Sequence, residues 1–257
     1  MIAQSIFSPS MWGRWISAVF CAAIVSATVG SSVSATVGSS SAFQDTRPVN
    51  VENPSTLEDF KAGDVDREPY QNATGLVAAL KVSRGAWVAD VGAGGGYYSM
   101  RLAEIVGSEG KVFAEDISDW RIRGLNARVK AFNLSNVEIV KGTPDDPRLP
   151  VDRLDAVLVV DSYHHFSNYE GMLDKILHSL KPGGRLVIAD YSFAEHRAQP
   201  RADQLKLHEI APELTRKEVE TAGFKVVKCE DPFAKWRSGH PRVEVADLWL
   251  MTAIRAK

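Results

Sequence analysis

Cysteine is scarce in this chain, and charge of either sign is not in excess. Of 257 residues, only Cys21 and Cys229 are cysteines. Because Cys21 falls in a segment that resembles a leader, we expect neither an internal disulfide nor a cysteine-based zinc site in the folded part. The formal net charge is −2 and no run of Lys or Arg is present, so we expect no nucleic-acid partner.

Charge is also almost absent from residues 1–44. Arg14 is the single charged side chain there, and the first acid is Asp45. An apolar stretch at 15–29 leads into two copies of Ser-Ala-Thr-Val-Gly-Ser-Ser, at 26–32 and 34–40. A short positive start, an apolar middle and a small-residue exit are typical of a secretory signal. We therefore expect an export signal or an N-terminal membrane anchor, with an organelle transit peptide or an untargeted cytoplasmic tail as alternatives; the sequence leaves cleavage open.

Beyond a polar linker at 45–66, apolar runs alternate with helical patterns over 67–257, which we expect to form one domain. Such alternation predicts an α/β fold, in which helices cover a parallel sheet. The expected strands are 86–91, 111–115, 137–140, 155–160, 185–190, 225–228 and 247–254. The expected helices are 73–80, 97–106, one that begins at Asp119, 170–180 and 215–222.

A glycine-rich turn follows the first expected strand. Residues 88–97 read Val-Ala-Asp-Val-Gly-Ala-Gly-Gly-Gly-Tyr. Glycines between a strand and a helix let the backbone approach a ligand closely. A nicotinamide dinucleotide site would need a glycine or alanine five positions after its first glycine. Tyr97 stands there if the motif starts at Gly92, and Ser99 if it starts at Gly94. The Gly-Lys-Ser/Thr of a phosphate-binding P-loop is missing as well.

Asp90, Gly92, Gly94 and Gly96 instead resemble the first motif of class I S-adenosylmethionine-dependent methyltransferases, Asp-x-Gly-x-Gly-x-Gly. The chain is similar to the type 11-like group of that class over about residues 70–255. This resemblance implies a Rossmann-like three-layer sandwich with a seven-stranded, mostly parallel sheet whose last strand is antiparallel. It implies S-adenosyl-L-methionine as cofactor, with the glycine turn beneath its methionine end and Asp90 organising its amino-acid moiety.

The same resemblance gives roles to acids at the ends of later strands. In this family an acid after the second strand holds the ribose hydroxyls; Asp116 fits that position and Glu115 is the register-shifted alternative. An acid after the third strand usually contacts the adenine, but Thr143 stands where that acid is common. Asp145, in preference to Asp146, is the expected contact, and a turn-capping role is the alternative.

The fourth expected strand ends in Asp161-Ser162-Tyr163-His164-His165. Ligands of open α/β sheets lie beyond the carboxyl ends of the strands, so we expect Asp161 at the cofactor and both histidines at the acceptor. The pair shapes the pocket or supplies a general base. Two adjacent histidines are weak evidence for a metal, and we expect none. In the family that this chain resembles, the stretch at 193–212 usually varies to recognise the acceptor, and its charge and histidine content here suggest a polar lid.

The sequence therefore predicts a methyltransferase that acts on a small molecule. It leaves open the acceptor, the methylated atom, the identity of any base and the oligomeric state. Two alternatives remain, an NAD(P)-dependent oxidoreductase on a similar sheet and a member that binds the cofactor without turnover.

Overall fold

The computed structural model describes residues 68, 70–235 and 247–256. All of them belong to the second of the two units into which the chain divides, Arg47–Lys257. The expected leader and the expected linker lie outside the described residues, so the export signal and the membrane anchor stay predictions. Among the helices that are described, none has both the length and the apolar character needed to cross a membrane.

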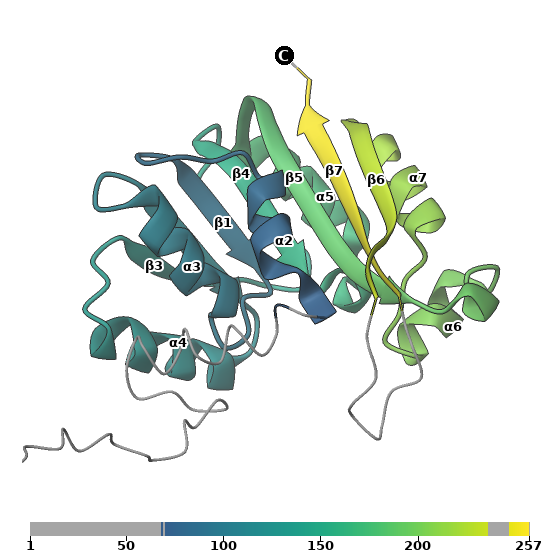
Figure 1. Ribbon diagram of the computed structural model, residues 1–257, viewed down its shortest axis with the longest axis horizontal. Helices are drawn as coiled ribbons and strands as arrows, with labels where there is room; N and C mark the ends of the chain where they lie inside the picture. Colours follow the sequence, from purple (N-terminus) through teal and green to yellow (C-terminus); the bar gives the residue numbers. More distant parts are fainter. Residues whose placement is uncertain (1–67, 69, 236–246, 257) are drawn as a thin grey trace, which may run out of the picture. The chain divides into compact units, whose positions relative to one another are not determined.

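A seven-stranded sheet organises the described part of the chain (Figure 1). Its strands are, in chain order, β1 (Trp87–Val91), β2 (Lys111–Asp116), β3 (Val137–Lys141), β4 (Leu154–Val160), β5 (Leu180–Ser192), β6 (Phe224–Lys235) and β7 (Asp247–Arg255). Across the sheet the order is β3-β2-β1-β4-β5-β7-β6. β1 to β5 pair in parallel, and β7 is antiparallel to both of its neighbours. The predicted Rossmann-like sheet is confirmed.

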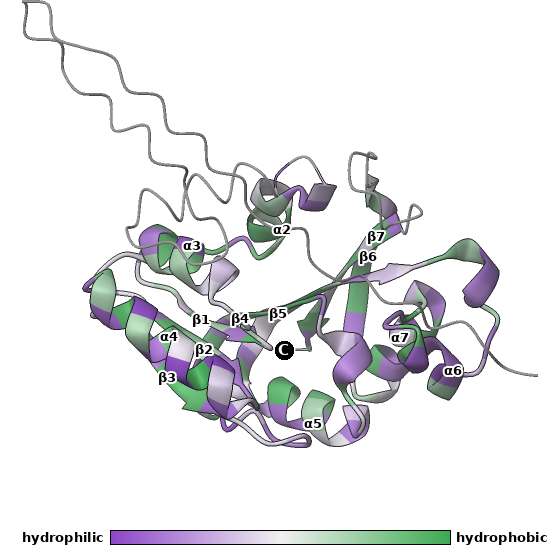
Figure 2. Ribbon diagram, turned by 90° about the horizontal axis from the view of Figure 1, so that it is seen from below, coloured by the Kyte–Doolittle hydropathy of each residue, from purple (hydrophilic) through white to green (hydrophobic). Residues whose placement is uncertain are grey.

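Helices cover both faces of this sheet and complete three layers (Figure 2). They are α2 (Ala73–Ala79), α3 (Tyr97–Val106), α4 (Asp119–Ala131), α5 (Tyr169–Ser179), α6 (Arg201–Lys206), α7 (Pro212–Thr221) and the short 3-10 helices η1 (Tyr163–His165) and η2 (Ala194–His196). Leu76 of α2 and Leu102 of α3 share one core cluster with β4. Leu173 of α5 and Val219 of α7 share a second cluster with the opposite face of β4.

β4 lies at the centre because its sequence is apolar on both faces. Successive strand residues point to opposite faces, and Leu158 and Val159 fall in the two different clusters, each 0% exposed. The strand order reverses between β1 and β4, where the crevice of an open α/β sheet forms. The glycine turn after β1 and the segment after β4 therefore meet at one edge of the sheet.

The bounds of three elements differ from the expected ones by three residues or more. β6 continues to Lys235 instead of ending at 228. α7 begins at Pro212 rather than at 215, since proline suits the first turn of a helix, where its missing N–H would have no partner. β5 begins at Leu180 rather than at 185 and includes Gly183 and Gly184. Its register against β4 shifts between Leu154 and Ala156, so these glycines form an irregularity within the strand.

We expect Leu158→Ala to lower the free energy of unfolding by about 2–5 kcal/mol, because it leaves a cavity in the middle of the sheet. Urea unfolding followed by circular dichroism measures this loss. Val151→Ala is the matched control, since Val151 is 64% exposed, and it should cost less than about 0.5 kcal/mol. Equal losses in the two variants would contradict the central position of β4.

Candidate active site

A cavity of about 580 Å³ lies at the carboxyl edge of β1, β2 and β4. The residues singled out in the sequence that line it include Asp90, Gly92, Gly94, Glu115, Asp116, Asp161 and His165. Gly96, Asp145 and His164 are not part of the lining. The volume falls within the range usual for small-molecule and cofactor sites, about 300–1,000 Å³.

The three motif glycines serve different purposes. A Cβ on Gly92 would lie 2.4 Å from the hydroxyl of Ser162, so this glycine lets the turn pack against the segment after β4. A Cβ on Gly96 would lie 2.8 Å from Leu125, so this glycine lets α3 approach α4. At Gly94 the φ angle is +56° and the nearest atom would be the carbonyl oxygen of Gly92, at 4.0 Å. Gly94 therefore leaves open space above the turn for a ligand.

Two acids at the end of β2 hold the glycine turn in place. The parallel register sets Val91 opposite Glu115. Gly94 donates its backbone N–H to Asp116 Oδ2 at 3.0 Å, and Gly92 donates to Glu115 Oε2 at 3.2 Å. The other oxygen of Asp116 accepts from the backbone N–H of Ser118. Because each carboxylate oxygen has two lone pairs, Asp116 retains acceptor capacity toward the cavity that it lines.

The histidine pair stands in η1, directly after β4. His164 is buried, and its Nδ1 lies 3.0 Å from Oδ1 of Asp190, which is 0% exposed at the end of β5. Burial alone would lower the pKa of His164, but the hydrogen bond and charge of Asp190 outweigh it and raise that pKa. His165 lines the cavity, and burial together with the neighbouring His164 and His208 lowers its pKa. Of the pair, His165 is the one that reaches the cavity.

Residues 88–184 match the family model described as a methyltransferase domain. By that match, this stretch of the chain is a methyltransferase domain, as its resemblance to the class I S-adenosylmethionine-dependent methyltransferases predicted. The match covers β1 to the start of β5 and therefore contains the glycine turn, both acids of β2 and the histidine pair.

Relatives of this methyltransferase domain include a demethylmenaquinone methyltransferase of Listeria welshimeri, 31% identical over 113 residues, which are 44% of this chain and 48% of that protein. The chain thus matches about half the length of its curated relatives. A solved S-adenosylmethionine-dependent methyltransferase of Aquifex aeolicus shares the fold, with a TM-score of 0.59 and 22% identity over 77% of this chain and 97% of that one. A cyclase shares it too, with a TM-score of 0.60 and 16% identity over 72% and 81%.

Two buried carboxyl groups of the methyltransferase domain titrate unusually. Burial raises the pKa of Asp90 to about 6, although Ser99 donates a hydrogen bond to it at 2.6 Å. Burial and the negative charge of Asp116 raise the pKa of Glu115 to about 8. Oε1 of Glu115 is buried without a hydrogen-bond partner among the described residues. Glu115 is therefore protonated at neutral pH, and it supports the turn rather than adding a charge to the cavity.

Three cavity residues carry no recognisable signal in the sequence. Arg128 of α4 donates to the carbonyl of Gly95 and fixes the turn from outside. Gln71, which precedes α2, accepts from the hydroxyl of Tyr98 at 3.2 Å, and both side chains line the cavity. Each becomes a site residue through the packing of a separate helix.

Two expectations about the surroundings need correction. The structure does not bring Asp145 to the cavity, because it is exposed and accepts from the hydroxyl of Thr143 at 2.8 Å, as a turn-capping residue does. Thr143 itself lines the cavity. The segment 193–212 is not a simple polar lid either. Glu209 is only 5% exposed and accepts from the backbone N–H of Phe193, which anchors the segment to the end of β5.

Gly94→Val should abolish binding of S-adenosylhomocysteine, measured by calorimetry, because the branched side chain would enter the open space above the turn. Gly183→Val is the control, since Gly183 also has a positive φ, +81°, and lies away from the cavity. Both variants strain the backbone, but only the first should lose the ligand. Normal affinity in Gly94→Val would refute the open turn.

Glu115→Gln should change how stability depends on pH. The pKa of Glu115 rises from 4.5 to about 8 on folding, so the folded protein binds more protons than the unfolded chain between these values. Its unfolding free energy therefore falls as pH rises through this window. Glu115→Gln keeps an acceptor for Gly92 and should flatten the fall, as measured by urea unfolding from pH 5 to 8. An unchanged slope would show that Glu115 titrates normally.

Proposed function

We propose that this protein transfers a methyl group from S-adenosylmethionine to a small molecule. The observation that carries the proposal is the bare backbone at Gly94 beside the carboxylate of Asp116, both on one cavity. The match covers only about half the length of the curated relatives. The activity and the acceptor of the whole protein are therefore part of our proposal.

The charge of the cavity lining favours this cofactor over a dinucleotide. Carboxylates of Asp90, Asp116 and Asp161 line it. The two guanidinium groups in the lining are those of Arg121 and Arg128, and Arg128 donates to a backbone carbonyl of the turn. A sulfonium nucleoside carries a positive charge, whereas the pyrophosphate of NAD(P) is negative. An acidic lining attracts the first and repels the second.

The cofactor supplies a methyl group that is already electrophilic on its sulfonium. Asp116 would accept hydrogen bonds from the ribose hydroxyls, and the open turn at Gly94 would receive the methionine end. The chain's remaining task is to align the acceptor and to exclude water, which can lower a reaction barrier by several kcal/mol. His165 is placed to contact the acceptor, since it lines the cavity from the segment after β4.

The apolar part of the lining supports a small and partly apolar acceptor. Phe166 and Met172, both nearly buried, line the cavity together with Tyr97 and Tyr98. The curated relatives carry the names of demethylmenaquinone methyltransferases, whose acceptors by name are quinone precursors. A demethylated quinol is therefore the first acceptor to assay, followed by metabolite extracts.

The test uses the full chain with S-adenosylmethionine labelled at the transferred methyl. We expect label to appear in a small molecule, identified by mass spectrometry, and not in added nucleic acid. Transfer to no acceptor, with cofactor binding intact, would favour the member that binds the cofactor without turnover. Binding of NAD in place of S-adenosylhomocysteine would favour the oxidoreductase.

Asp116→Ala should weaken cofactor binding by about 1–3 kcal/mol, or about 5- to 150-fold, through loss of charged hydrogen bonds. Asp119→Ala is the matched control, because this exposed acid begins α4 and is not part of the cavity lining. Calorimetric titration with S-adenosylhomocysteine compares the two. An unchanged dissociation constant in Asp116→Ala would remove Asp116 from the cofactor site.

A further inference from the structure

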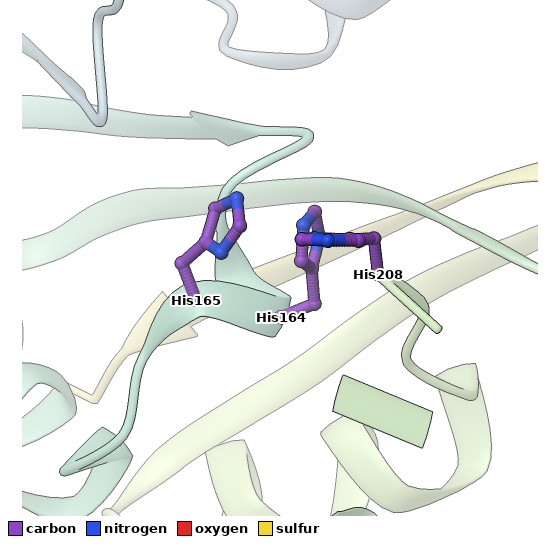
Figure 3. Close-up of side chains that lie close together, drawn as sticks. All are labelled: His164, His165 and His208. Carbon is purple, nitrogen blue, oxygen red and sulfur yellow. The ribbon is translucent and has the colours of Figure 1, made fainter. Parts of the chain in front are cut away.

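Three histidines from two separate segments come together beside the cavity (Figure 3). His164 and His165 belong to η1, and His208 follows α6. The ring centroids are 4.0 Å apart for His164 and His165, 5.7 Å for His164 and His208, and 5.5 Å for His165 and His208. Each of the three histidines has one ring nitrogen that lies within 4.8 Å of a ring nitrogen of both other histidines. Three imidazoles in contact are a donor set typical of a transition-metal site.

We propose that His164, His165 and His208 bind one divalent transition-metal ion of the zinc type at the acceptor end of the cavity. Three protein ligands leave a fourth, open position, which is the arrangement of catalytic rather than structural zinc sites. The sequence alone predicts no metal, because the adjacent pair is weak evidence and the third histidine lies far along the chain.

The contact between His164 and Asp190 suits a metal-binding histidine. Both oxygens of Asp190 lie within 3.1 Å of its Nδ1, and the same carboxylate accepts from the backbone N–H of His164. A carboxylate only accepts, so Nδ1 carries the proton and the lone pair of the ring is on Nε2. Metal-binding histidines commonly have such a carboxylate on the other ring nitrogen.

The backbone that carries His208 is fixed to the strand that carries Asp190. Ile210 donates its N–H to the carbonyl of Tyr191 at 3.0 Å, and Glu209 binds the N–H of Phe193 at 2.9 Å. His208 is therefore held beside η1 although it comes from a different segment. Its side chain and that of His165 are exposed and can rotate.

Distances and charge also suit a cation. Ligands at about 2.0–2.1 Å from tetrahedral zinc are about 3.4 Å apart. The upper limit of 4.8 Å therefore corresponds to a closure of at most about 1.4 Å, which rotation of the two exposed rings can supply. Asp161 and Asp190 both place a carboxylate oxygen within 4.8 Å of a ring nitrogen of His164, so the surrounding charge favours a metal ion.

The role of such an ion in catalysis rests on the proposed function. An acceptor hydroxyl or thiol bound at the open position would lose its proton to solvent. Its lone pair would then form the bond to the methyl carbon, while the carbon–sulfur bond of the sulfonium breaks and its electrons stay on sulfur. The histidines would then act as ligands, and none of them would have to accept the proton.

The test measures ion binding without cofactor or acceptor, so it does not depend on methyl transfer. The full chain, prepared without a histidine tag, is titrated with Co²⁺ and followed by its visible absorption, and with Zn²⁺ by calorimetry. We expect one ion per chain and an absorption spectrum of a four-coordinate site. His165→Gln and His208→Asn should each weaken binding about tenfold or more; Asn suits position 208, where φ is +56°.

His178→Gln is the control, since His178 is an exposed histidine on α5 and not part of the cluster. It should bind the ion like the unaltered chain. Circular dichroism without ion checks that each variant is folded. Failure of the unaltered chain to bind the ion, or full binding in either cluster variant, would overturn the site. Methyl transfer that fails while ion binding follows this pattern would contradict the proposed function and leave the metal site standing.

Discussion

The hydrogen bonds from the glycine turn to the end of β2 determine the geometry of this site. Parallel register sets Val91 opposite Glu115, so the chain that leaves β1 must pass the two acids that end β2. Gly92 and Gly94 donate to those acids with N–H groups that no helix satisfies. The turn stays open as a result, α3 begins directly after it, and the cavity forms above it.

Holding the turn with carboxyl groups has a cost in stability. Glu115 is 1% exposed, and one of its oxygens has no hydrogen-bond partner in the described part of the chain. Burying such a group without a full set of partners is unfavourable, and the same burial raises the pKa of Glu115. Ionisable groups with shifted pKa values are common at functional sites, because the chain keeps a binding geometry there that is not its most stable arrangement.

Two sets of side chains meet at the same edge of the sheet. β1 and β2 supply the turn and Asp116, whereas β5 and the segments after β4 and α6 supply Asp190, His165 and His208. The sheet itself is shared with a solved methyltransferase and with a cyclase. Because one fold supports different reactions, the fold alone does not define the chemistry, and our proposals rest on these side chains.

The sequence by itself determined the layered fold and the cofactor end of the cavity. Both depend on residues that are neighbours in the chain. Apolar runs such as β4 identify the strands, and Asp90 and the motif glycines follow one another within a single short segment. Only the tertiary structure decided that Arg128 and Gln71 line the cavity and that Asp145 does not. These side chains are placed by the packing of helices and loops onto the sheet, and contacts between distant segments leave no local pattern in the sequence.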